Sequence, residues 1–136
     1  MERRLNVDGI EYEVLDEPEQ IEGYVLRVAD EEWDPEDFDD FGADLHGKSW
    51  SLERVAVARV RPQNTLLASP EFQADVQPRI AAQRCMHRRG EAIPPLILRG
   101  ADLLIFDGYA RWHLFRELGI STCLAYVGRT RGTGGS

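Results

Sequence analysis

Apolar and polar residues alternate near the start of the chain, a pattern typical of β-strands with one buried face. Residues 5–7 and 10–15 follow it on either side of Asp8-Gly9. An Asp-Gly dipeptide between alternating runs is a strong β-hairpin signal. Residues 24–28 alternate in the same way, and we expect them to add a third strand.

Helical spacing replaces alternation in the middle of the chain. Residues 55–60 form a short β-branched run that predicts a strand, and residues 71–89 predict a helix. The apolar positions of this helix are Val76, Ile80, Ala81, Cys85 and Met86. Pro78 lies inside the same window, so either Asp75 caps a new helix just before it, or the helix is broken or kinked there.

Two nearly continuous apolar runs, residues 96–99 and 103–106, predict buried strands joined by a turn. Residues 108–118 predict a helix that ends at Gly119, the residue type favoured for a left-handed cap. A last strand is expected over residues 120–127. The side chains expected to face inward from the helix are Leu114, Phe115 and Leu118.

The order of these elements indicates an α+β fold, namely a small mixed α/β domain with an N-terminal β-hairpin extension and an acidic segment. At 136 residues the chain is long enough for one hydrophobic core and short for two. We expect the N-terminal extension to cover residues 1–50 and the main domain residues 51–128. Residues 129–136 are expected to form a flexible tail.

Charge is divided unequally between the two parts of the chain. Residues 1–50 hold 17 acids and 4 bases, whereas residues 51–136 hold 7 acids and 12 bases, all of them arginine. The first part therefore carries −13 and the second +5, which together give the net charge of −8. Because an acidic chain is repelled by nucleic acid on average, direct DNA binding is not expected.

Acidic charge is densest in residues 30–44, where Trp33, Phe38 and Phe41 are set among carboxylates. One interpretation is a solvated loop that these aromatic residues pin in place. The other is an acidic flap over the basic domain, or a contact for a basic protein partner with the aromatic residues as anchors.

No apolar run approaches the roughly 20 residues of a membrane span, and the first residues lack the apolar stretch of a secretion signal. We therefore expect a cytoplasmic protein without membrane contact. Cys85 and Cys123 have no metal-ligand spacing, and both are interpreted as reduced core thiols. His46, His87 and His113 are scattered, so no metal site is expected from them.

The junction between the second apolar strand and the following helix is the best candidate for a binding site. Free amide groups and the positive end of a helix dipole meet there, and Gly108 permits a close approach by an anion. Arg111 is unfavourable in a first helical turn unless a negative group lies beside it. Asp107 can cap the helix and pair with Arg111. Alternatively, Arg111 and the amides hold a phosphate, with Asp107 orienting the arginine or binding an accompanying Mg²⁺.

Several segments around this junction occur in an ordered combination. They are residues 93–98, the loop sequence Phe106-Asp107-Gly108-Tyr109-Ala110-Arg111, the helix end Glu117-Leu118-Gly119 and a closing strand. Together they resemble the ParB/sulfiredoxin superfamily over residues 52–127. Because members of that superfamily bind nucleotide phosphates at this loop, the resemblance implies phosphate binding at Gly108, Tyr109, Ala110 and Arg111. Gly108 and Arg111 match the loop glycine and the final arginine of the family.

The loop also departs from its relatives. Tyr109 and Ala110 stand where sulfiredoxins have a catalytic cysteine and a histidine, so the nucleophile of sulfiredoxin chemistry is missing. Kinase relatives use a glutamate after the first strand, where residues 61–64 read Arg-Pro-Gln-Asn. Asp107 is then the one well-placed carboxylate for phosphoryl transfer or nucleotide hydrolysis.

Three functions remain open at the level of sequence. The leading hypothesis is a protein that binds an ATP- or CTP-type nucleotide with Mg²⁺, and acts as a phosphotransferase or nucleotide hydrolase if Asp107 is catalytic. The second is a non-catalytic protein-interaction module of the same fold. The third is an accessory factor in DNA maintenance.

Overall fold

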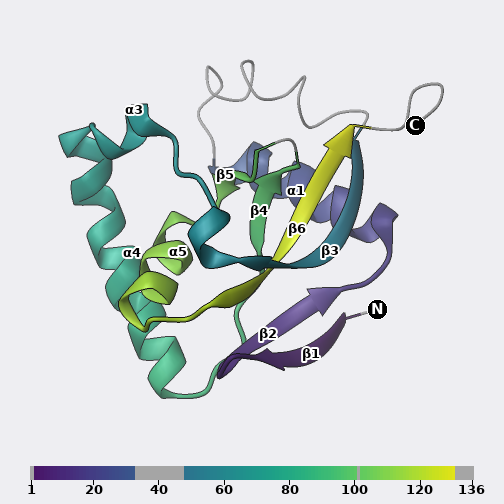
Figure 1. Cartoon of the computed structure of the whole chain (residues 1–136), viewed down its shortest axis with the longest axis horizontal. Helices are drawn as coiled ribbons and strands as arrows, with labels where there is room; N and C mark the ends of the chain where they lie inside the picture. The colour runs from purple at the N-terminus through teal and green to yellow at the C-terminus, as the bar shows by residue number, and fades with distance from the viewer. Residues whose placement is uncertain (1, 33–47, 101, 131–136) are drawn as a thin grey trace.

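The computed structural model describes residues 2–32, 48–100 and 102–130. In chain order (Figure 1) its elements are β1 (Glu2–Val7), β2 (Ile10–Leu15), α1 (Pro18–Glu32), β3 (Lys48–Ala56), the 3₁₀ turn η1 (Val57–Arg59), α3 (Asn64–Leu67), α4 (Pro70–Arg88), β4 (Leu96–Arg99), β5 (Leu104–Asp107), α5 (Tyr109–Glu117) and β6 (Thr122–Thr130). The predicted α+β class, with its N-terminal β-hairpin, is confirmed. Residues 33–47, which include most of the acidic segment, lie outside the described residues, whereas residues 30–32 belong to α1.

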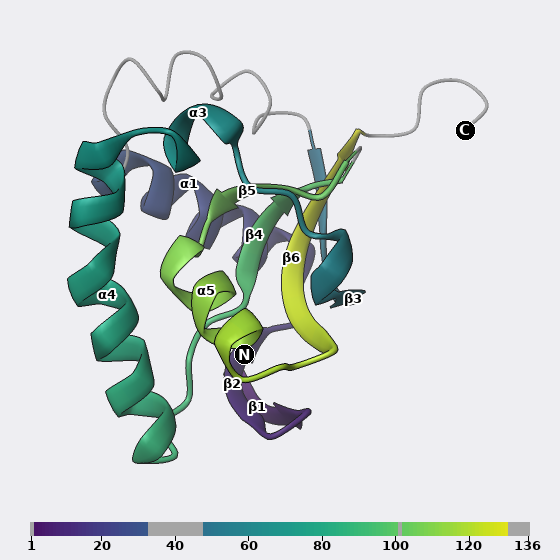
Figure 2. The ribbon, with the colours of Figure 1, turned by 60° about the vertical axis from the view of Figure 1, so that its left-hand side comes forward.

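A mixed four-stranded sheet of order β3-β6-β4-β5 forms the centre of the molecule. β3 pairs antiparallel with β6, β6 pairs parallel with β4, and β4 pairs antiparallel with β5. Helix α1 lies on one side of this sheet, and α5, backed by α4, lies on the other (Figures 1 and 2). The sheet is therefore the middle layer of three.

The sheet packs into a core on each face. Successive side chains of a strand point to opposite faces, so a single strand supplies residues to both cores. In β4, Leu96 and Leu98 enter the core on the α5 side and Ile97 enters the core on the α1 side. In β5, Ile105 and Phe106 are divided in the same way. The prediction of two buried strands is confirmed, and burial on both faces explains why their sequences are nearly continuously apolar.

The expected third strand at residues 24–28 is wrong, because these residues belong to α1. Ile21, Val25, Val28 and Ala29 recur at helical spacing and pack against the sheet. A window of five residues is too short to separate a period of two from one of 3.6. The helical period becomes visible only when Ile21 and Ala29 are included.

The strand predicted at residues 55–60 is partly wrong. β3 ends at Ala56, and the chain then turns through η1, where Val60 N donates to Val57 O at 3.2 Å. Residues three apart in a 3₁₀ turn lie on the same side, so Val57 and Val60 both enter the core. The β-branched composition indicated burial correctly and extended backbone incorrectly.

Helix α4 continues through Pro78, so the predicted helix is confirmed and no break occurs there. Its N-cap is Ser69, whose Oγ accepts a hydrogen bond from Phe72 N at 3.2 Å. Asp75 consequently caps no new helix. Cys85 is exposed on this helix, so its interpretation as a core thiol is wrong, whereas Cys123 is fully buried in β6 and burial raises its pKa to about 12.

Helix α5 ends as predicted, with Gly119 at φ 69°. Leu114 and Phe115 are at most 1% exposed, as expected. Leu118 is 43% exposed, so its predicted inward orientation is wrong. It is the C-cap, one position beyond the last helical residue, and helical spacing no longer fixes its direction.

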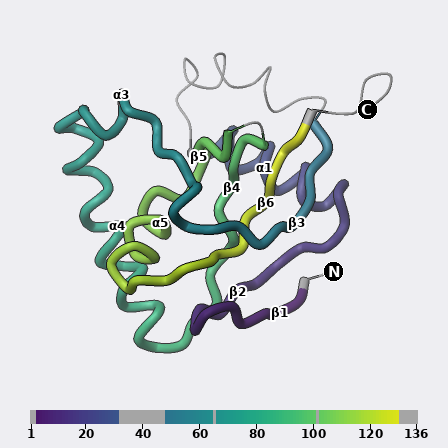
Figure 3. Tube along the Cα trace, in the orientation of Figure 1, coloured from purple at the N-terminus to yellow at the C-terminus, as the bar shows by residue number. Residues whose placement is uncertain are grey.

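The N-terminal hairpin turns through Asp8 and Gly9, both at positive φ, as a two-residue hairpin turn requires. It lies below the β3–β6 pair in the view of Figure 3 and forms its own two-stranded sheet. Ile10, Tyr12 and Val14 are at most 2% exposed and share the core that contains α4 and α5. The hairpin is therefore part of the main packing unit.

Several residues on both sides of the predicted boundary between residues 50 and 51 share cores, and the boundary falls inside β3. Among residues 2–32, 48–100 and 102–130, no helix combines the length and the apolar character that a bilayer crossing requires. Arg129 and Thr130, the first residues of the predicted flexible tail, instead belong to β6 and pair with β3, so the tail prediction is wrong for these two residues. Residues 131–136 lie outside the described residues. A cytoplasmic location stays a prediction.

The two leucines at the end of α5 provide a test of this packing. Leu114→Ala is expected to lower the free energy of unfolding by about 2–5 kcal/mol, because a cavity replaces a buried side chain. Leu118→Ala is expected to change it by less than about 1 kcal/mol, because Leu118 is already 43% exposed. Urea unfolding measures both, and equal losses would contradict the assigned orientation of the helix end.

The hairpin tip provides a second test, because Thr122 Oγ1 and N donate to Asp8 Oδ2 at 2.7 and 3.1 Å. The hydroxyl and then the amide hold the pKa of Asp8 below its ordinary value of 3.8. A carboxylate with a lowered pKa in the folded state stabilises the fold above its unfolded pKa, and this contribution is lost as the pH falls through the folded pKa. Asp8→Asn is therefore expected to melt below the wild type at pH 7.

The melting temperatures of wild type and Asp8→Asn are expected to converge as the pH drops below about 4, where the wild-type carboxylate takes up its proton. Thermal unfolding followed by circular dichroism between pH 2 and pH 7 gives both curves. A difference that stays constant over this range would show that the charge of Asp8 contributes nothing to hairpin docking.

Candidate functional site

The candidate site is the point where β5 passes into α5. β5 ends at Asp107, Gly108 is the N-cap, and Tyr109 is the first helical residue. No side chain caps this helix start. Because the first amides of a helix have no intrahelical carbonyl acceptor, they are available to another acceptor at this point.

Gly108 makes the reversal from strand to helix at φ 110°, a conformation that residues with a side chain rarely adopt. A Cβ atom at this position would lie 2.5 Å from Leu96 Cδ2 and 3.0 Å from Arg111 Nη2. The backbone therefore comes close to both β4 and the arginine. Only glycine satisfies the dihedral angle and this contact together.

Arg111 is buried, with 9% of its surface exposed. Its Nη2 donates to Asp107 Oδ2 at 3.0 Å and to Pro95 O at 3.3 Å. The pairing of Asp107 with Arg111 that the sequence predicts is therefore present. Asp107 is not the cap of the helix, however, because the strand extends through it and Gly108 takes the capping position.

The guanidinium of Arg111 is only partly satisfied by the protein. Both hydrogen bonds named above use Nη2, and Nε is buried without a partner among the described residues. An unpaired donor on a buried cation costs free energy comparable to a lost hydrogen bond. This cationic group lies against the positive end of α5, so the local electrostatics favour a negative group.

Tyr109 and Ala110 contribute backbone rather than side-chain groups to the site. The Tyr109 ring packs edge-on against Phe72, with 5.0 Å between the centroids. Its hydroxyl accepts a hydrogen bond from Gln63 N at 2.8 Å, and burial raises its pKa to about 12. The phenol is therefore a structural group, and Ala110 has no polar side chain.

The loop after η1 is fastened to β5 beside the site. Arg61 N donates to Leu103 O at 3.0 Å, and Ile105 N donates to Arg61 O at 2.9 Å. Gln63 Nε2 also reaches Ile105 O at 3.3 Å. From the sequence, this loop is of interest for the glutamate that it lacks. In the structure it holds Tyr109 and β5 in place through these hydrogen bonds.

Pro95 and Leu96 are the other site residues that the sequence did not single out. Pro95 supplies a carbonyl acceptor to Arg111, and Leu96 forms the wall against Gly108. Both belong to the extended entry into β4, where Pro95 has no N–H to donate but its carbonyl accepts from Arg111. The sequence signal was present in Pro94-Pro95 but indicated only a strand entry.

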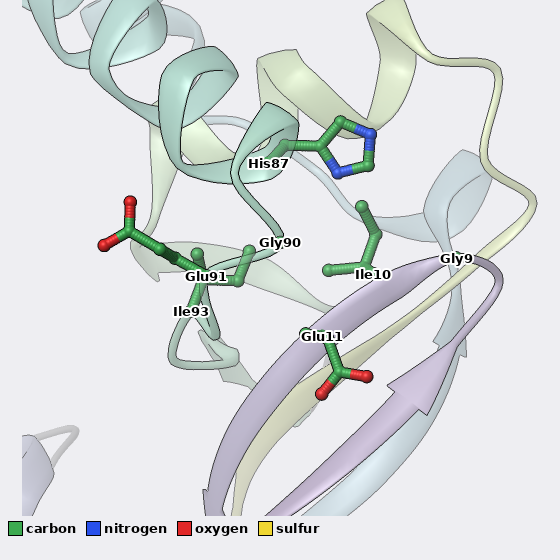
Figure 4. Close-up of a pocket in the computed structure, with 7 residues that line it drawn as sticks. All are labelled: Gly9, Ile10, Glu11, His87, Gly90, Glu91 and Ile93. Atoms are coloured by element: carbon green, nitrogen blue, oxygen red, sulfur yellow. The ribbon is translucent and has the colours of Figure 1, made fainter.

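The hollow drawn in Figure 4 is a weaker candidate. It lies between the end of α4 and the start of β2, where His87, Glu11 and Glu91 contribute to its lining. In Figure 4 the two carboxylates point in different directions, and neither points toward the imidazole. Within the described ranges of the chain, no group of three or more His, Cys, Asp or Glu residues could hold a metal ion.

No family model and no curated protein matches the chain. A solved pNOB8-like ParB N-domain is similar over 60% of this chain and 28% of its own length, with a TM-score of 0.41 and 21% identity. A second structure, the C2221 form of the Pnob8-like ParB-N domain, matches 60% of this chain and 31% of its own, with a TM-score of 0.42 and 18% identity. The predicted resemblance to a ParB N-terminal domain is therefore observed as a partial structural similarity at low identity.

The close contact at Gly108 can be tested by substitution. Gly108→Ala is expected to lower the free energy of unfolding by about 3 kcal/mol or more, because it adds backbone strain and a clash with Leu96 and Arg111. Gly119→Ala is the matched control. Gly119 also has a positive φ, but a Cβ there meets nothing within 4 Å, so only the strain of about 1–2 kcal/mol is expected.

Chemical denaturation of both alanine variants separates the two contributions. A larger loss for Gly108→Ala measures the contact with Leu96 and Arg111 beyond the shared backbone strain. Equal losses would mean that the helix start is not packed as closely as the distances indicate.

Proposed function

We propose that this chain binds a nucleoside di- or triphosphate at the N-terminus of α5. The observation that carries the proposal is the buried guanidinium of Arg111, which lies against an uncapped helix start and keeps Nε without a partner among the described residues. Phosphate is the ligand class that best matches a planar cation beside free backbone amides.

Each residue of the loop has a distinct part in this binding mode. The amides of Tyr109, Ala110 and Arg111 donate to phosphate oxygens, because they have no intrahelical acceptor. Gly108 has no side chain and leaves room for an oxygen close to the backbone. The Arg111 guanidinium supplies charge and directional N–H donors.

The site fits a Mg²⁺ ion that Asp107 and the nucleotide phosphates would hold together. Asp107 binds Arg111 through Oδ2, and among the described residues no hydrogen bond to its Oδ1 is found. Mg²⁺ is commonly held by one or two carboxylates together with phosphate oxygens and water. Asp107 would supply one ligand, and the ion would reduce the charge of the phosphates.

Binding without turnover is the second candidate, and a specific observation favours it. A general base needs a carboxylate that is free to accept a proton, whereas Asp107 is paired with Arg111 and the Tyr109 hydroxyl is bonded to Gln63. Phosphoryl transfer or hydrolysis through Asp107 would have to use Oδ1 while Oδ2 holds Arg111. A non-catalytic module that only binds the nucleotide needs no such dual role for Asp107.

A ligand screen with matched arginine variants tests the proposed function. ADP, ATP, CTP and GTP with Mg²⁺ are added to the wild type and the unfolding free energy is measured. A ligand at one hundred times its dissociation constant stabilises the fold by about 2.7 kcal/mol. Arg111→Ala is expected to abolish this stabilisation, and Arg111→Lys to weaken it, because lysine keeps the charge and loses the planar donors.

Arg116→Ala is the matched control, since it removes the same charge from the exposed end of the same helix and is expected to keep ligand stabilisation. Release of inorganic phosphate, measured in parallel, separates turnover from binding. The proposal is refuted if no nucleotide stabilises the wild type, or if Arg111→Ala and Arg116→Ala respond alike.

A further inference from the structure

The ion pair inside the proposed site has a consequence for ligand choice. Asp107 Oδ2 lies 3.0 Å from Arg111 Nη2, with side chains 25% and 11% exposed. The carboxylate thus already occupies Nη2, one of the guanidinium donors that a phosphate oxygen would use. At this separation in partly buried surroundings, electrostatic interactions are much stronger than in bulk water.

We infer that Asp107 is the selectivity residue of this site and discriminates against phosphates that arrive without a divalent cation. The inference rests on the proposed function. A metal-free polyphosphate places negative charge beside the carboxylate, and the repulsion opposes binding. A cation-bound polyphosphate brings less negative charge and offers the carboxylate a new partner in exchange for Arg111.

The geometry of Asp107 suits such an exchange better than that of the neighbouring ion pair. Asp102 uses both carboxylate oxygens with Arg99, at 3.0 and 2.8 Å, and also accepts from Leu104 N. Asp107 bonds to Arg111 through one oxygen only, and it is the last residue of β5 rather than part of a turn that it stabilises. Asp107 can turn toward a ligand without leaving a backbone amide unpaired.

The helix start adds to the discrimination. With Asp107 in place the Arg111 charge is compensated, and the positive end of α5 alone attracts the ligand. Once a cation takes the carboxylate, the full charge of Arg111 becomes available to a phosphate oxygen. The same residue therefore weakens binding of the wrong ligand and permits binding of the right one.

The test compares wild type with Asp107→Asn, using inorganic triphosphate as the probe so that no base contact contributes. Calorimetric titrations are run with Mg²⁺ and with EDTA. The wild type is expected to bind the probe at least about tenfold more tightly with Mg²⁺. Asp107→Asn is expected to bind the metal-free probe at least about tenfold more tightly than the wild type does, so that its Mg²⁺ dependence largely disappears.

Asp102→Asn is the matched control, because it removes a paired carboxylate in the turn before β5 and is expected to keep the wild-type Mg²⁺ dependence. Melting curves verify that each variant is folded. If Asp107→Asn does not fold, Asp107→Ser replaces it in the same titrations and is expected to show the same loss of Mg²⁺ dependence. Equal affinity of the wild type with Mg²⁺ and with EDTA overturns the inference without any variant.

The outcomes separate this inference from the proposed function. Binding by the wild type without Mg²⁺ dependence, or weaker metal-free binding by Asp107→Asn, overturns the selectivity role and leaves phosphate binding intact. The second result would mean that Asp107 positions Arg111 rather than competing for it. Absence of binding by both proteins under either condition overturns the proposed function itself.

Discussion

Burial of the four-stranded sheet on both faces is the constraint from which the rest of the structure follows. β5 is an edge strand, and its neighbour β4 has three buried residues, Leu96, Ile97 and Leu98. The chain that leaves β5 turns back at once and covers the sheet with α5. Gly108 makes that reversal. Its lack of a side chain brings the helix start against Leu96 and allows Arg111 to fold over it. The candidate site is thus located where Gly108 brings the start of α5 against β4.

The Asp107–Arg111 pair is difficult to explain by stability alone. Removing two charges from water is expensive, and apolar side chains of similar size often stabilise a fold as well or better. Here the arginine is buried, one of its donors has no partner among the described residues, and the helix dipole opposes its charge. A buried cation under these conditions is consistent with a ligand-binding role, because an anionic ligand would offset the free-energy cost of burying Arg111.

The sequence predicted the central elements because their patterns were unambiguous. The continuous runs of β4 and β5 and the glycine that ends α5 have few alternative interpretations. The wrong predictions came from short sequence segments that were interpreted without their neighbours. Residues 24–28 alternate by chance inside a longer helical period, and Val57 is β-branched because it is buried in a turn rather than extended in a strand. Leu118 lies one position too late for helical spacing to fix its direction.

Prediction of the site succeeded for contacts that are local in sequence and failed for those that are not. Asp107 and Arg111 are four residues apart, so their pairing follows from helix geometry. The carbonyl of Pro95, the wall formed by Leu96 and the tie from Gln63 to Tyr109 join segments distant in the chain. A single sequence contains no signal for these contacts, because they depend on how β4 and the loop after η1 meet the helix start.

The N-terminal hairpin has a practical implication for where the chain can be shortened. The similarity that the sequence suggests covers residues 52–127, yet Ile10, Tyr12 and Val14 fill the interior next to α5, and the Tyr126 hydroxyl accepts from Leu15 N at 2.9 Å. Trimming to the recognisable part would open the hydrophobic interior to water and leave a buried phenol without its donor. The residues that carry the resemblance are therefore fewer than the residues that pack around α5, the helix that carries Arg111.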